Sequence, residues 1–87
     1  MPIVWIPALM RDLTGGLTQV DVPGSTVREV IENLESRFPG VSARLVVEGR
    51  LRTNLTVIVD GETAQKRLRQ PVGEHSEIHF LPAISGG

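Results

Sequence analysis

The chain has 87 residues and a mass of 9.5 kDa, which suffices for one small domain with a modest core and leaves no room for a second domain. Nine Lys and Arg against ten Asp and Glu give a formal net charge of −1, which argues against nucleic acid as the main partner. No residue is cysteine, and this excludes disulfides, thiolate metal sites and a thiol nucleophile.

The N-terminal part of the chain predicts a hairpin. Residues 3–9 are rich in β-branched and aromatic side chains and predict a strand, with Pro7 at a bulge, on an unpaired side or near the end of the strand. Residues 17–22 predict a second strand. The turn Thr14-Gly15-Gly16 between them makes an antiparallel pair the favoured arrangement.

Residues 26–38 predict the main helix. Thr26 and Glu29 have the spacing of a capping box, and Pro39-Gly40 ends the segment. A single apolar stripe follows the cap at helical spacing, formed by Val27, Val30, Ile31, Leu34 and Phe38. This stripe predicts that one side of the helix packs on a core.

The second half of the chain is mostly strands. Residues 41–47 are interpreted as a short helical turn leading into a brief strand, and residues 49–52 as a loop. Residues 55–59 predict a strand closed by the turn Asp60-Gly61, after which residues 62–66 return as a short strand. Residues 70–74 predict a loop and residues 77–81 the final strand.

This order of elements favours an α+β fold. We expect a β-grasp (ubiquitin-like) roll, in which a mixed four- to five-stranded sheet packs on one main helix at about residues 26–38. The first and last strands would then lie side by side in the middle of the sheet. We expect residues 1–82 to form the β-grasp domain and residues 83–87 to form a flexible C-terminal Gly-Gly tail.

Patterns for catalysis and metal binding are missing. His75 and His79 fall in a predicted loop and a predicted strand, which do not place them as a metal-binding helical pair. No nucleophile elbow or phosphate loop is present, so we expect no catalytic residues, no metal site and no cofactor bound by the chain itself. No apolar run approaches the ~20 residues of a membrane span, and no secretion signal is recognised. We therefore expect a cytoplasmic protein without membrane contact, monomeric when free.

The closing segment is the one place where chemistry could occur; it comprises Leu81, Pro82, Ala83, Ile84, Ser85, Gly86 and Gly87. Pro82 discourages helix, and the small residues suit a slim, extended tail that threads a channel in another protein. The carboxylate of Gly87 is ionised at neutral pH and must be activated, for example as an adenylate made with ATP. Attack by sulfide or persulfide would then give a thiocarboxylate, and attack by an amine would give an amide.

With this tail behind a β-grasp, the sequence resembles the MoaD/ThiS family of ubiquitin-like sulfur carriers over nearly its whole length. It is similar in particular to the CysO type, which supplies sulfur for cysteine, through Ile6-Pro7, Thr14-Gly15-Gly16, Ser42-x-Arg44-Leu45 and Leu81-Pro82-Ala83-Ile84. The resemblance implies that a ubiquitin-activating-type (MoeB/ThiF-like) enzyme, using ATP and magnesium, adenylates Gly87, which then becomes a thiocarboxylate. A sulfur-accepting synthase would take the sulfur with Leu81–Gly87 in its active site. The chain would be a protein cosubstrate and not an enzyme.

Several alternatives remain open from the sequence. The sulfur could enter cysteine, a sulfur-containing cofactor or another metabolite, and one such role is the small subunit of molybdopterin synthase. A ubiquitin-like modifier conjugated to lysines would use the same tail with a different nucleophile. A non-catalytic β-grasp interaction domain with an inert tail is the third class.

Two groups of residues are candidates for a partner surface. Strand alternation turns Ile58 away from the helix if its neighbours face it, and the same argument turns Trp5 outward. The reversed register, with Trp5 in the core, is nearly as well supported by the sequence. The basic run of Lys66, Arg67 and Arg69 is interpreted as a solvated loop or as a docking patch for an acidic partner.

Overall fold

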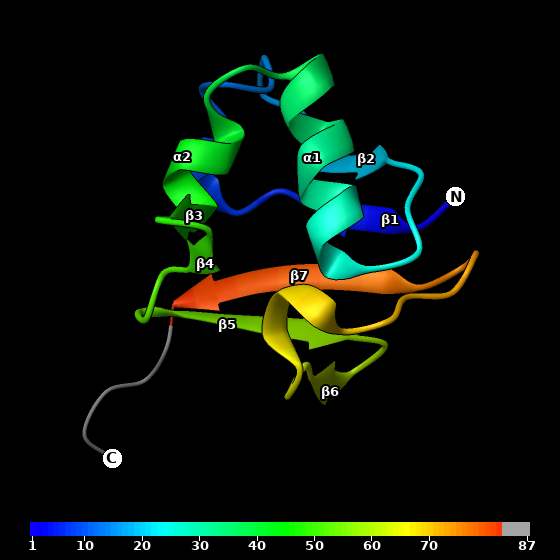
Figure 1. Cartoon of the computed structure of the whole chain (residues 1–87). Coiled ribbons are helices and arrows are strands. Elements are labelled where there is room, and N and C mark those ends of the chain that lie inside the picture. Colours follow the sequence, from blue (N-terminus) through cyan, green and yellow to red (C-terminus); the bar gives the residue numbers. More distant parts are fainter. Residues whose placement is uncertain (83–87) are drawn as a thin grey trace.

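A five-stranded mixed sheet and one main helix organise the computed structural model, which describes residues 1–82 (Figure 1). The sheet has the order β2-β1-β7-β5-β6, with β1 and β7 parallel and the other neighbours antiparallel. Its strands are β1 (Ile3–Trp5), β2 (Gln19–Asp21), β5 (Leu55–Val59), β6 (Glu62–Thr63) and β7 (Glu77–Pro82). The first and last strands are therefore central neighbours, and the expected β-grasp roll is confirmed.

Helix α1 (Val27–Arg37) lies over one face of this sheet (Figure 1). The Thr26 side chain caps it by accepting a hydrogen bond from the amide of Glu29 at 3.2 Å. Four residues of the predicted stripe are buried, namely Val27, Val30, Ile31 and Leu34, while Phe38 packs against the core at the helix end. The main helix and its cap are as the sequence predicts.

A second helix and a small hairpin close one end of the fold. Helix α2 (Val41–Leu45) leads into β3 (Val46–Val47), as expected for this segment, and β3 pairs with β4 (Arg50–Leu51). Two short 3₁₀ helices, η1 (Ala8–Met10) and η2 (Arg67–Arg69), complete the described elements. Among residues 1–82 no helix has both the length and the apolar character needed to cross a membrane.

The structure corrects several predicted boundaries. The strand predicted over residues 3–9 is shorter, because β1 ends at Trp5. Pro7 cannot donate to a strand partner, and it precedes the 3₁₀ helix η1. Residues 49–52 are not all loop, since Arg50 and Leu51 form β4. The short strand predicted over residues 62–66 ends at Thr63. The basic run, interpreted as a loop, is partly helical, because Arg67 and Arg69 belong to the 3₁₀ helix η2. The strand predicted over residues 17–22 is the shorter β2.

Candidate partner-docking face and tail base

The outer face of the sheet, which points away from α1, carries one row of side chains across all five strands. The strand register aligns Trp5 with His79, and His79 with Ile58. Gln19 and Thr63 extend the row to the edge strands. Val4 and Ile6 are buried on the opposite side, so the prediction that Trp5 and Ile58 face outward is confirmed.

Trp5 and His79 form a stacked pair at the centre of this row. Their ring centroids are 5.4 Å apart and their planes differ by 7°. The Trp5 Nε1 donates a hydrogen bond to Oε1 of Glu77 at 3.1 Å, which orients the indole on the sheet. The stack forms a flat aromatic surface on the outer face of the sheet. The sequence argument missed His79, although its place between the buried Ile78 and Phe80 already implies an outward side chain.

A groove of about 500 Å³ begins at this stack and runs to the end of β7. We call it the aromatic groove; it is lined by Trp5, Ile6, Pro7, Ala8, Leu9, Arg11, His79, Phe80, Leu81 and Pro82. Leu9 and Leu81 are both 46% exposed, so the groove carries accessible apolar surface. Leu81 and Pro82, which the sequence analysis assigned to the tail inserted into partners, are thus one wall of the groove.

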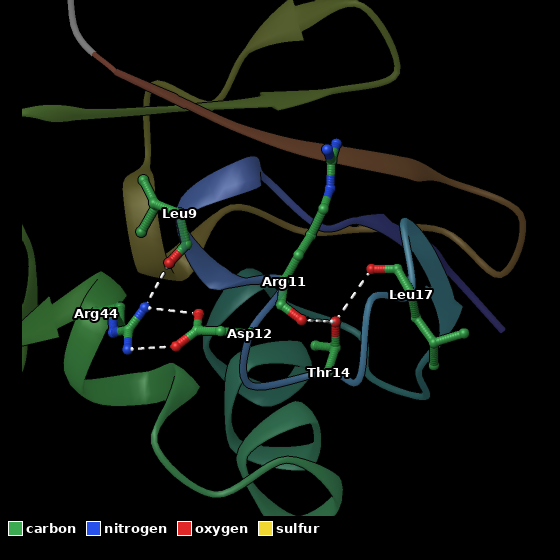
Figure 2. Close-up of polar contacts among 6 residues, drawn as sticks. All are labelled: Leu9, Arg11, Asp12, Thr14, Leu17 and Arg44. Atoms are coloured by element: carbon green, nitrogen blue, oxygen red, sulfur yellow. Dashed lines mark hydrogen bonds and ion pairs between the residues drawn. The ribbon is translucent and has the colours of Figure 1, made fainter.

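The other wall of the aromatic groove is held in place by Arg44 of α2 (Figure 2). Its guanidinium forms a two-point ion pair with Asp12, with both N–O distances at 3.1 Å, and donates to the carbonyl oxygen of Leu9. The same contact lowers the pKa of the Asp12 carboxyl, chiefly through the Arg44 hydrogen bonds. The turn that follows Asp12 is held by the buried side chain of Thr14, whose hydroxyl donates to the carbonyl oxygen of Leu17 at 3.0 Å.

A second concavity, of about 580 Å³, lies between α1, β4 and η2. We call it the basic groove; its lining includes five cationic side chains, those of Arg28, Arg50, Lys66, Arg67 and Arg69. The predicted basic run is therefore joined by two arginines from other elements. Arg67 differs from the rest, because its guanidinium donates to the carbonyl oxygens of Leu55 at 2.8 Å and Arg52 at 2.9 Å.

The base of the tail lies between these two grooves. Strand β7 ends at Pro82, which pairs with Leu55 on β5. Pro82 lines the aromatic groove, and Leu55 accepts the hydrogen bond from Arg67 of the basic groove. The predicted attachment site Gly87 and the tail residues Ala83, Ile84, Ser85 and Gly86 lie outside the described residues.

The start of β7 is fixed by the carboxylate of Asp60. Its oxygens accept hydrogen bonds from the amide of Glu77 at 2.9 Å and the buried hydroxyl of Ser76 at 2.7 Å. These two bonds hold the pKa of Asp60 below its ordinary value, and the bond from the Glu77 amide has the larger effect.

Within residues 1–82 no group of three or more His, Cys, Asp or Glu is arranged to hold a metal ion. His75 is exposed before β7, whereas His79 lies within it.

The fold and the strand that leads to a Gly-Gly segment define a ubiquitin-like carrier protein. The chain belongs to the ThiS family, whose model matches residues 4–87. It is 32% identical over 89 residues to the sulfur carrier protein CysO of Mycobacterium tuberculosis, covering 97% of this chain and 96% of that protein.

Two solved structures have the same fold over nearly the full length of the chain. One is the crystal structure of the Amycolatopsis orientalis BexX/CysO complex, with a TM-score of 0.91, 37% sequence identity and 100% of both chains covered. The other is Mycobacterium tuberculosis CysO, with a TM-score of 0.90 and 29% identity over 97% of this chain and 100% of that one. The chain is accordingly a sulfur carrier protein that acts with partner enzymes, and the comparisons do not favour the three alternative functions.

Proposed function

We propose that the chain carries sulfur as a thiocarboxylate on Gly87 and delivers it to cysteine biosynthesis. The observation that carries the proposal is the similarity to CysO over nearly the full length of both proteins. The absence of cysteine is compatible with it, since no side-chain thiol competes with the terminus for sulfur.

The chemistry proceeds in two balanced steps. The Gly87 carboxylate attacks the α-phosphorus of ATP, which forms an acyl-adenylate and releases pyrophosphate. Hydrogen sulfide then attacks the acyl carbon, which forms a C–S bond, breaks the C–O bond to AMP and releases a proton. Glycine at the last two positions leaves this carbonyl open to attack from either side. ATP and magnesium are bound by the activating enzyme.

The activating enzyme in this proposal is of the MoeB/ThiF type and docks on the outer sheet face. The stacked Trp5–His79 pair, Ile58 and the exposed side chain of Leu81 supply an ordered apolar surface, which is the composition typical of an interface core. The grooves flank the end of β7, so an enzyme seated there holds its active site next to the tail. The related CysO of Amycolatopsis orientalis has been crystallised in a complex with BexX. A synthase that accepts the sulfur is the second partner.

Thiol labelling tests the proposal on the whole chain. The protein is incubated with a MoeB/ThiF-type enzyme, magnesium, ATP and sulfide, and then with a fluorescent iodoacetamide. Because the chain contains no cysteine, it becomes labelled only where sulfur has been added. We expect ATP-dependent labelling of the intact chain and none of a matched chain without Gly86 and Gly87. Equal labelling of the truncated chain would contradict attachment at Gly87.

The destination of the sulfur is tested separately. The thiocarboxylated chain is made with radioactive sulfide, freed of small molecules and added to a desalted extract of the source organism supplied with serine and ATP. We expect the label to appear in free cysteine. Label that appears only in a cofactor fraction would contradict the cysteine assignment and leave the carrier chemistry intact.

A further inference from the structure

We infer that the basic groove binds an acidic segment of the enzyme that binds and activates the tail. The inference rests on the proposed function and adds the chemistry of the partner's contact. Five of the nine Lys and Arg residues of the chain line this one concavity, and none of its other lining residues is acidic. In a chain with a net charge of −1, such a concentration makes a local positive field.

No carboxylate of residues 1–82 forms an ion pair with a cation of the groove. The one ion pair among residues 1–82 is Arg44 with Asp12, which lies on the wall of the aromatic groove. Glu29 is adjacent in sequence to Arg28, but its carboxylate accepts bonds from the amide and hydroxyl of Ser25 at 2.8 and 2.9 Å. The cations of the groove are thus available for an external acid.

The groove is also ordered before any partner arrives. Leu68 of η2 is buried, and the amide of Val27 donates to the carbonyl oxygen of Gln70 at 3.0 Å, which ties the start of α1 to η2. Arg67 donates to the carbonyl oxygens of Arg52, which precedes β5, and of Leu55, the first residue of β5. Because these acceptors are neutral, they do not neutralise its positive charge. Its φ of +56° is a conformation that costs a non-glycine residue energy, and the structure maintains it here.

The layout suits a row of carboxylates better than a single phosphate or a nucleic acid. Arg28, Arg50, Lys66 and Arg69 are all exposed, and they come from three different elements around an open concavity. An enclosed phosphate site would instead bring buried donors to one point. An overall negative charge disfavours a long nucleic-acid track. An extended segment with several Asp or Glu matches the spread of charges.

The basic groove lies next to the base of the tail. Arg67 holds the carbonyl of Leu55, and Leu55 pairs with Pro82, the last residue of β7. An acidic segment in the basic groove therefore lies beside the tail base, where it would steer the carrier and set its orientation as the tail enters the partner.

Direct binding is tested by titrating the isotope-labelled full chain with a hexaglutamate peptide and following its amide resonances by NMR. We expect saturable shifts at the groove residues Leu51, Thr53 and Leu68, and none there with hexalysine. Saturable shifts of the same residues with inorganic phosphate, at equal affinity, would overturn the assignment to an acidic peptide. Weak shifts spread over the whole surface would overturn the site itself.

The role in tail activation is tested with a charge-matched pair of variants. Lys66→Gln/Arg69→Gln and Arg37→Glu both lower the net charge by two. Arg37 lies about 14 Å along α1 from Arg28, and the residues that its side chain contacts, Asp21 and Phe38, do not line the basic groove. At low ionic strength we expect the groove variant to lose about tenfold or more in kcat/KM for activation, and Arg37→Glu to behave as wild type. The gap should close near 1 M salt, where the Debye length is about 3 Å. Equal slowing of both variants, or of neither, would overturn the inference.

The same assay separates this inference from the proposed function. At saturating enzyme, all variants should reach the same final extent of thiol labelling, because the tail is unchanged. If the wild-type chain is never labelled, the proposed function has failed, and the NMR titration still decides whether the groove binds an acidic peptide.

Discussion

The two faces of the five-stranded sheet are built from alternate residues of the same strands, and they differ sharply in burial. The inner face, which packs under α1, is buried: no more than 2% is exposed of Val4, Val57, Ile78 and Phe80. On the outer face, Trp5, Ile58 and His79 are each partly exposed. The inner residues form the core that holds the fold together, whereas the outer residues are not part of it. Substitutions on the two faces should therefore have separable effects.

The largest expected difference comes from one substitution made on both faces. Ile78→Ala removes a fully buried side chain and should lower the free energy of unfolding by about 2 to 5 kcal/mol. Ile58→Ala, on the adjacent strand but facing outward, should cost about 1 kcal/mol or less. Urea unfolding of the two variants measures this contrast. Equal losses would show that the outer face is also core.

A glycine pair tests how tightly the segment before α1 packs against the helix. A Cβ added at Gly24 would lie 2.8 Å from Cγ2 and 2.9 Å from the amide nitrogen of Val30, so Gly24→Ala forces the start of the helix to move. We expect a loss of about 2 kcal/mol in the free energy of unfolding. Gly49→Ala is the control, because its Cβ meets nothing within 4 Å and only its positive φ costs energy, about 1 kcal/mol. A smaller effect at Gly24 than at Gly49 would contradict the packing.

Trp5→Ser should lower the rate of tail activation more than it lowers the stability of the fold. It removes the stack with His79 and the hydrogen bond to Glu77, which together contribute about 1 kcal/mol to stability. We expect the rate of tail activation to fall by at least about tenfold, since large aromatic side chains commonly anchor interfaces. Thermal unfolding and thiol labelling measure the two effects on the same samples. A collapse of the melting transition with normal activation of the folded fraction would reverse this assignment.

The smallest predicted effect depends on pH. The pKa of Asp60 lies below its ordinary value of 3.8, so its charged form stabilises the folded chain above that pH, and the contribution disappears as pH falls through the folded pKa. Asp60→Asn keeps an acceptor for the Glu77 amide but loses charge, and should cost about 0.5 to 1 kcal/mol at neutral pH after solvent screening. In denaturant titrations the difference between the two proteins should begin to shrink below about pH 4 and vanish once the pH lies below the folded pKa. A constant difference down to pH 2 would contradict the role of the charge.

Much of the fold was predictable because its signals are local. Thr26, Glu29 and the apolar stripe define α1 within one continuous segment, and the alternation of residues 55–59 identifies β5 and the outward side chain of Ile58. The choice between the two registers at Trp5 was not local. It was decided by the pairing of β1 with both β2 and β7, which buries Val4.

What escaped prediction depends on contacts between distant segments. Strand β4 has two residues and exists through its pairing with β3, a contact that leaves no periodic pattern. The basic groove gathers Arg28 and Arg50 next to a run that is 16 to 41 residues away, which only the folded chain brings together. The sequence analysis considered His79 only as a metal ligand, and its stack with Trp5 follows from the parallel pairing of the first and last strands.

The mass of one peptide tests the central claim most directly. Trypsin cleaves after Arg69, the last lysine or arginine of the chain, and releases residues 70–87, which contain no methionine, tryptophan or cysteine. Replacement of oxygen by sulfur is nearly equal in mass to an oxidation. The peptide lacks the side chains that oxidise most readily, and fragmentation separates a change at Gly87 from an oxidation at His75 or His79. After activation, we predict a gain equal to sulfur minus oxygen, located by fragmentation at Gly87. A peptide of unchanged mass, from a chain that the enzyme and ATP have fully processed, would contradict the account.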